Sequence, residues 1–265
     1  MNKLDYLIQY LLKETGKANL RYKEEEKKKL YRKLVNIRKA KPISEEFLNV
    51  EDEYLQEELK KKKIADVAYI KTVAEQYEIS NLANSDKICF WKGSITELKV
   101  DAVVNAANSM GLGCFRPNHN CIDNQIHTNA GVRLRLSCNK IMKVIDYNIG
   151  TGNAILTSGY NLPCKYIIHT VGPVVSTYVS KQKEEELYNC YMKSLELAVE
   201  NGARTVAFPC ISTGVFNFPK DLASAIALFA VDKFISHNRE KIDKVVFVLW
   251  KDEDVEIYEK KLEII

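Results

Sequence analysis

The sequence lacks any apolar run approaching the roughly 18 to 20 residues needed to span a bilayer, so we expect no membrane span. Its first residues, MNKLDYLIQYLLKETG, carry acidic side chains and no small-residue cleavage site, unlike a secretory signal peptide. Internal repeats and low-complexity linkers are absent as well. What is present, 46% hydrophobic residues in a chain of 265, suits one sizeable domain with an appendage and excludes global disorder.

Cysteine is not rare in the sequence, but the cysteines do not form an obvious disulfide framework. The chain has seven cysteines, an odd number scattered over its length. Disulfide scaffolds are short, secreted chains with even cysteine counts. We therefore expect reduced thiols and a cytoplasmic protein.

The charge excess is confined to the start of the chain. The net charge is +4, and residues 1–70 hold 17 Lys and Arg against 13 Asp and Glu. The basic runs RYKEEEKKKL (residues 21–30) and LKKKKIADV (residues 59–67) contain acidic residues and no basic–aromatic patch, which is typical of solvated helix faces. We expect no nucleic-acid partner.

The first 80 residues predict a helical extension. Apolar residues recur every three or four positions in LDYLIQYLL (residues 4–12), and Gly16 is placed to end that helix. A second helix is predicted over residues 23–37, and Ser44 marks the start of a third. The face that would dock onto a neighbour is formed by Phe47, Leu48, Tyr54 and Leu55.

From about residue 87 the pattern changes to short strands that alternate with helices. Strands are predicted at residues 87–93, 101–108, 153–159, 165–172, 205–212 and 244–250, and helices at residues 124–144, 184–201 and 220–237. This alternation predicts an α/β domain over residues 81–265 with a largely parallel sheet. Ligands of such sheets bind at the carboxyl ends of strands, where the glycine-bearing loops SMGLGC and STGVF lie.

Four segments, KGSITEL, DAVVNAANS, HTVGP and ISTGVFNFP, resemble in order and spacing the macrodomain, a module that binds ADP-ribose. The resemblance implies a three-layer α/β/α fold with a mixed sheet. Backbone N–H groups of a strand-to-helix loop can point at a pyrophosphate, and glycine allows close approach. The residues expected there are Ser212, Thr213, Gly214, Val215 and Phe216, with Phe216 against a ribose or base. The alternative is an ordinary turn.

The stretch GCFRPNHNCIDNQIH (residues 113–127) contains two cysteines, two histidines and an aspartate. Two thiolates and an imidazole, from Cys114, Cys121 and His119, are good zinc ligands that leave one tetrahedral position open. The string is similar to the pattern of zinc-dependent macrodomains, so we predict one Zn²⁺ per chain. The alternative is two buried, inert cysteines and a lone loop histidine.

The resemblance also assigns neighbours of that stretch. It implies that Asn108 reaches the distal ribose and shares catalysis with Asp123, while Cys121 and Ile122 line the ADP-ribose. Asp123 has two compatible roles, a helix cap or a water-orienting general base.

Other polar and sulfur-bearing residues nearby are predicted to be structural. Asn105 is expected to tie loop backbone together. His127 is expected to face neighbouring loops, and His169 to satisfy backbone groups at the end of a buried strand. The other cysteines, Cys89, Cys138, Cys164, Cys190 and Cys210, are predicted to belong to the core.

One position departs from the family pattern. Macrodomains usually have an aspartate that accepts a hydrogen bond from the adenine amino group, and this chain has Ser94 there. Serine is shorter and uncharged, which puts adenine selectivity in doubt, whereas backbone contacts of Ile95 can remain.

The resemblance implies a zinc-dependent hydrolase that removes mono-ADP-ribose from acidic side chains of a modified protein. Members of that branch reverse a sirtuin-type transferase, often on a lipoyl-carrier protein. Two alternatives use the same pocket: a non-catalytic ADP-ribose reader, and a hydrolase of small esters such as O-acetyl-ADP-ribose.

Overall fold

The fold is built on a mixed, largely parallel sheet in a computed structural model that describes residues 2–18, 20–78 and 80–263. Six strands lie in the order β2-β7-β6-β3-β5-β4, and β1 pairs with β3 beyond this path. All pairs are parallel except β4 with β5. The strands are β1 (Ala65–Asp66), β2 (Ile88–Lys92), β3 (Leu98–Ala106), β4 (Ala154–Ser158), β5 (Cys164–Thr170), β6 (Thr205–Phe208) and β7 (Lys244–Leu249).

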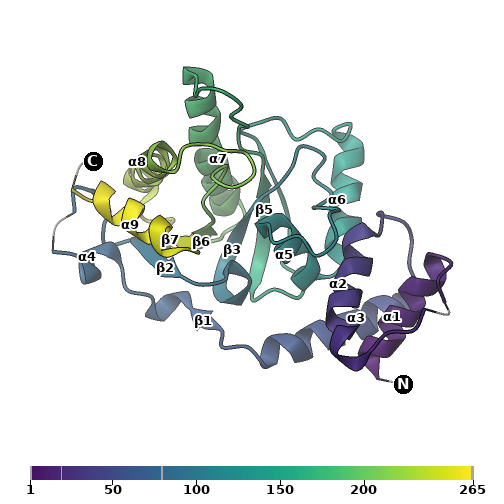
Figure 1. Cartoon of the computed structure of the whole chain (residues 1–265). Helices are drawn as coiled ribbons and strands as arrows, with labels where there is room; N and C mark the ends of the chain where they lie inside the picture. The colour runs from purple at the N-terminus through teal and green to yellow at the C-terminus, as the bar shows by residue number, and fades with distance from the viewer. Residues whose placement is uncertain (1, 19, 79, 264–265) are drawn as a thin grey trace.

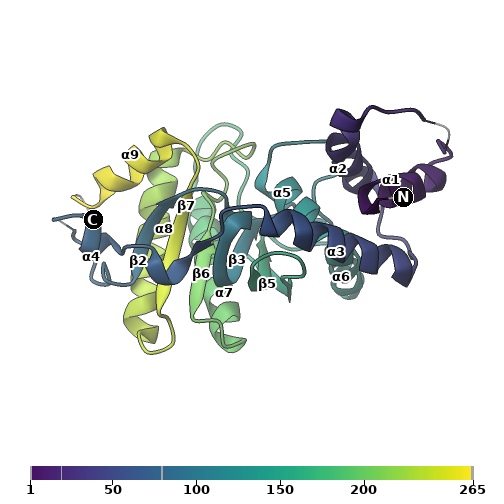
Figure 2. The same ribbon diagram turned by 90° about the horizontal axis from the view of Figure 1, so that it is seen from below.

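Helices cover both faces of this sheet (Figures 1 and 2). One face packs against α7 (Lys181–Glu200), α8 (Lys220–Asn238) and α9 (Asp252–Lys261), and the other against α5 (Ile122–Ala130) and α6 (Val132–Val144). The run of residues 102–104 in the central strand β3 is apolar without interruption because both faces of the sheet are buried there. Val104 packs toward α7 and α8, whereas Val103 packs toward α5 and α6. The predicted three-layer α/β/α class is confirmed.

The helix predicted over residues 124–144 is wrong as a single helix. It divides at Gly131, whose φ of 91° ends α5 and precedes α6. A Cβ added to Gly131 would lie 3.0 Å from Glu51 Oε2 as well as in a strained conformation. The two-residue β1 and the C-terminal α9 were also not predicted from the sequence.

The N-terminal helices form a body of their own beside α5 and α6 (Figure 2). They are α1 (Lys3–Glu14), α2 (Lys27–Ile37) and α3 (Glu45–Lys60), and Ser44 caps α3 by accepting from the Phe47 amide at 3.2 Å. The expected docking face of α3 is buried in their shared apolar cluster. After α3 the chain packs with the sheet instead, through Val67 and Ile70. Within the described residues, no helix is both long and apolar enough to cross a membrane.

A buried carboxylate joins this helical body to the α/β domain. Glu51 of α3 accepts hydrogen bonds from the Tyr31 hydroxyl and from the Val132 amide, both at 2.7 Å. The Val132 amide is the first of α6, where N–H groups lack a carbonyl partner within the helix. Burial raises the pKa of Glu51 to about 7, although both donors oppose the shift.

We expect Glu51→Gln to flatten the pH dependence of stability. The folded carboxyl has a pKa near 7 against 4.5 for the free group, so folded protein holds more protons between these values. Wild-type stability should therefore fall as pH rises through this window, by on the order of 3 kcal/mol relative to the variant. Urea unfolding at several pH values measures this, with exposed Glu53→Gln as the control. Parallel profiles for wild type and Glu51→Gln would refute the assignment.

Candidate active site

Two loops meet at the carboxyl ends of the adjacent strands β3 and β6. The loop after β3 leads to α5 on one face of the sheet, and the loop after β6 leads to α8 on the opposite face. Chains that diverge in this way leave a crevice between the loops, where α/β sheets bind their ligands. The residues predicted as a site lie on these two loops and at the end of β2.

The loop after β6 offers unpaired amide groups. Ser212 has a left-handed φ of 64°, and Gly172 lies so close that a Cβ there would be 2.0 Å from the Ser212 hydroxyl oxygen. The Val175 amide donates to the Phe216 carbonyl at 2.8 Å and fixes the far end of the loop. Among the described residues, none accepts a hydrogen bond from the amides of residues 213–216. Free backbone donors on a half-exposed loop suit an anionic ligand.

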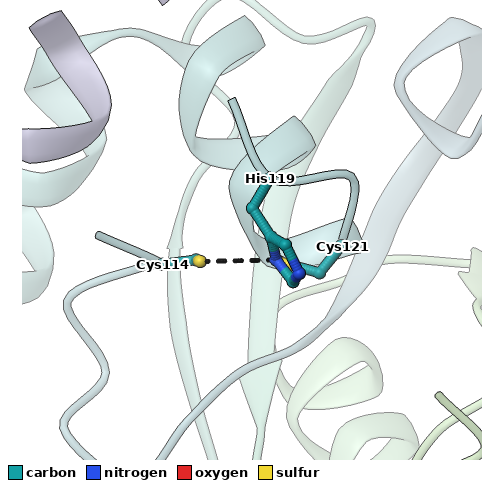
Figure 3. Close-up of side chains that lie close together, drawn as sticks. All are labelled: Cys114, His119 and Cys121. Carbon is teal, nitrogen blue, oxygen red and sulfur yellow. Dashed lines mark hydrogen bonds between the residues drawn. The ribbon is translucent and has the colours of Figure 1, made fainter. Parts of the chain in front are cut away.

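The structure brings Cys114, His119 and Cys121 together on the loop after β3. Their ligating atoms all lie within 4.8 Å of one another, and the three side chains point toward a common centre (Figure 3). Cys114 Sγ lies 3.7 Å from His119 Nδ1. All three residues are half-buried, so one side of the group faces solvent.

Cys121 also begins the following helix. It is the N-cap of α5, and its Sγ accepts from the Asn124 amide at 3.4 Å. Burial, and then the neighbouring Cys114, raises the pKa of the Cys121 thiol to about 12 against this amide donor. A bound divalent cation reverses that preference because it stabilises the thiolate directly.

Asp123 does not act as the cap of α5, because the N-cap is Cys121 and the Asp123 carboxylate accepts from side chains instead of from the first backbone amides. It accepts from Asn105 Nδ2 at 2.8 Å and from Asn108 Nδ2 at 3.3 Å, so the capping alternative is wrong. Burial raises its pKa to about 6 despite these donors. A buried carboxyl with a pKa near neutrality can exchange a proton at physiological pH.

The interior of the site is a side-chain network rather than the backbone ties that the sequence predicted. Asn105 binds Asp123 and His169, the latter at 3.0 Å, instead of loop backbone. His169 binds the Thr157 hydroxyl at 2.9 Å instead of backbone groups, and burial lowers its pKa to about 4. Both expectations are therefore corrected. The network holds Asp123 in one orientation.

His127 packs as expected against a neighbouring loop. A Cβ on Gly113 would lie 2.7 Å from its ring, which explains glycine at that position. Its Nε2 lies 3.6 Å from Asp123 Oδ1, but burial lowers the His127 pKa well below its usual value. The imidazole is thus neutral, and the contact is not an ion pair.

Sequence reasoning missed Arg135, which is buried in α6. Its guanidinium donates to the Leu112 carbonyl at 2.8 Å and lies 4.4 Å from the centre of the Phe115 ring. It shares the buried stripe of α6 with Cys138 and Met142. A charged residue in an apolar helical stripe is the signal that could have revealed it.

At the end of β2, Ser94 is half-buried and its hydroxyl pairs with Thr96 Oγ1 at 2.9 Å. The next residue, Ile95, is buried. The preceding Gly93 amide donates to the Leu249 carbonyl at 3.3 Å, which brings the adjoining Trp250 to the same edge. Trp250 is 68% exposed. This exposed aromatic residue was not predicted from the sequence.

A three-layer α/β domain with free backbone amides on a loop at its strand switch point has the layout in which open α/β sheets bind ligands. Residues 104–227 match the model of the Macro domain family. The chain is 45% identical over 232 residues to a Protein-ADP-ribose hydrolase of Staphylococcus aureus strain MSSA476, covering 87% of this chain and 83% of the relative. It is 43% identical to a Protein-ADP-ribose hydrolase of Treponema medium, with 96% of each chain covered. The chain belongs to the macrodomain family.

Solved structures agree with this membership. The Trypanosoma brucei macrodomain in complex with ADP-ribose superposes with a TM-score of 0.67 at 28% identity, covering 83% of this chain and 91% of that one. The Oceanobacillus iheyensis macrodomain with ADP superposes with a TM-score of 0.60 at 36% identity, covering 66% and 90%.

Proposed function

We propose that this protein is a zinc-dependent hydrolase that removes mono-ADP-ribose from acidic side chains of a modified protein. One observation carries the proposal. Where the β3 loop joins α5, the buried carboxylate Asp123 lies two residues after Cys121, a member of the Cys–His–Cys group. The relatives named Protein-ADP-ribose hydrolase support this reading.

The two loops would hold the ligand. The diphosphate would rest on the free amides of residues 213–216, and the first-turn amides of α5, at Ile122 and Asp123, are further donors. Asn108 and Asp123 would flank the distal ribose, since an amide group offers both donor and acceptor atoms to a diol. The adenine would lie near Ser94 and Ile95 at the end of β2.

The Cys114, His119 and Cys121 group fits zinc in its donor set. Zinc prefers thiolate and imidazole ligands at about 2.0–2.3 Å in tetrahedral geometry, and the three ligating atoms already lie within 4.8 Å of one another. Three protein ligands leave a fourth position for a ribose hydroxyl or a water. When bound, zinc would supply Lewis-acid polarisation of that oxygen.

The protein's own residues would carry the proton. Hydrolysis adds a water oxygen to C1″ of the ribose and breaks the bond from C1″ to the side-chain carboxylate, which leaves as an anion. The water proton needs an acceptor, and Asp123 is the buried carboxylate poised to take it. Asn105 and Asn108 would hold that carboxylate toward the ribose.

The partner would be a protein modified by a sirtuin-type transferase, with a lipoyl-carrier protein as the first substrate to test. Incubating zinc-loaded protein with a carrier protein that bears ADP-ribose on Asp or Glu should release free ADP-ribose. Binding without release would favour a reader, and release only from O-acetyl-ADP-ribose would favour the small-ester hydrolase.

All seven cysteines are free, and the reduced thiols that the zinc group requires support a cytoplasmic setting.

Adenine recognition gives a further prediction. Ser94→Asp should bind ADP-ribose more tightly, by roughly 0.5–1.5 kcal/mol, because a carboxylate can accept from the adenine amino group. Titration calorimetry measures the gain. The control ligand is the analogue with an unsubstituted purine base, which lacks the amino group and has no other donor on that edge, so it should gain nothing from the carboxylate of the variant. Equal or weaker ADP-ribose binding by the variant would place the adenine elsewhere.

A further inference from the structure

The N-terminal helix α2 lies against the loop that carries the Cys–His–Cys group. The contact joins residues about 90 positions apart in the chain and includes α5, which follows the loop. It is made by two side chains on one face of α2, Arg32 and Asn36, four residues apart. This face differs from the one that packs Leu34 and Tyr31 into the N-terminal apolar cluster.

Asn36 holds the residue that precedes the histidine of the group. Its Oδ1 accepts from the Asn118 amide at 2.9 Å, and its Nδ2 donates to the Thr128 hydroxyl at 3.0 Å. Asn118 has a left-handed φ of 54°, which is uncommon outside glycine. Such a conformation persists where neighbouring contacts stabilise it. The buried Asn36 supplies one of these contacts.

Arg32 contacts the backbone of His119, the histidine of the group. Its Nη2 donates to the His119 carbonyl at 2.6 Å and to Asn124 Oδ1 at 2.8 Å. Asn124 in turn offers its amide to Cys121 Sγ and its side chain to the Arg116 carbonyl at 3.0 Å. One guanidinium thus reaches the backbone of one group member and, through Asn124, the sulfur of another.

Arg135 links the C-terminal end of α2 to the same loop. The buried Arg135 donates to the Val35, Asn36 and Arg38 carbonyls at the end of α2 and also to the Leu112 carbonyl at the start of the loop. Loop and helix therefore share one anchor. Movement of α2 relative to the loop would break several charge-assisted hydrogen bonds at once.

We propose that α2 is a clamp on the candidate metal centre, with Arg32 and Asn36 as positioning residues that hold the His119 backbone for ligation. The N-terminal helices would then be part of the site rather than an appendage to it. This inference rests on the zinc centre proposed above. Partners that orient metal ligands typically contribute 10- to 100-fold in metal affinity when removed.

The test measures zinc affinity of the full-length protein by competition with a chromophoric chelator. Arg32→Ala and Asn36→Ala should each weaken zinc binding about 10- to 100-fold. Lys33→Ala, on an exposed part of the same helix, should leave affinity unchanged. Thr128→Ala removes the other partner of Asn36 but spares the loop contact, so it should also retain the affinity.

The conservative variants separate positioning from folding. Asn36→Asp keeps the acceptor for the Asn118 amide and should recover most of the affinity lost in Asn36→Ala. Arg32→Lys is one bond shorter and lacks the Nε that also donates to Asn124 Oδ1 at 3.2 Å, so it should remain weak. Wild-type affinity in a folded Arg32→Ala protein would overturn the clamp, as would losses that follow only the fraction of protein unfolded by melting. Absence of zinc binding in wild type would instead reject the metal centre itself, and the clamp with it.

Discussion

Replacing Asp123 with alanine is expected to slow release of ADP-ribose by a factor on the order of 10²–10⁴, with affinity for free ADP-ribose retained within a few-fold. The reason is that its buried carboxylate is held by two asparagine side chains and does not cap the helix. Single-turnover release from an Asp- or Glu-modified protein measures the rate. Calorimetry with ADP-ribose measures the affinity, and the melting temperature measures the stability.

Two control variants separate a loss of catalysis from a loss of stability. Loss of the carboxylate removes one acceptor from each of the Asn105 and Asn108 amide groups, at a cost of about 1–3 kcal/mol, so Asp123→Asn, which keeps the shape, accompanies the alanine variant. Asp5 also lies in the first turn of a helix, in α1, and pairs with Lys27. Asp5→Ala should retain the full rate. If Asp123→Ala and Asp123→Asn both fold and release ADP-ribose at the wild-type rate, the catalytic role is wrong.

Removal of zinc is expected to abolish release of ADP-ribose and leave the fold intact. Cys121→Ser is the most discriminating variant because serine is a strong N-cap and so retains the start of α5, whereas its hydroxyl is a poor zinc ligand. Elemental analysis should find one zinc per wild-type chain and almost none in the variant. Activity lost after chelation should return when zinc is added back.

The matched control is a cysteine outside the group. Cys164 is half-buried at the start of β5, and Cys164→Ala should retain a full equivalent of zinc. Purified wild type without zinc, or Cys121→Ser with full metal content, would contradict the proposed centre. Full activity in a chelated, folded protein would leave the metal with no role in hydrolysis.

Features encoded by neighbouring residues were predictable. The apolar runs of β2, β3, β5 and β7 stand out because strands buried on both faces need continuous apolar sequence. The Cys114, His119 and Cys121 group was visible as well, since a short loop can bring its own side chains together without the rest of the fold. Gly131 shows the limit: its glycine was visible, but not the close approach of Glu51 that helps divide the helix there.

The sequence by itself determined the class of fold, the two glycine-bearing loops at the strand ends and the members of the Cys114, His119 and Cys121 group. Only the tertiary structure decided the partners of the Asp123 carboxylate, the network through Asn105 and His169, and the contact of Arg32 with the His119 carbonyl. These depend on how helices and strands pack, because a side chain's partners lie across the fold rather than along the chain. Hydrogen bonds between residues about 90 positions apart leave no periodic pattern to read.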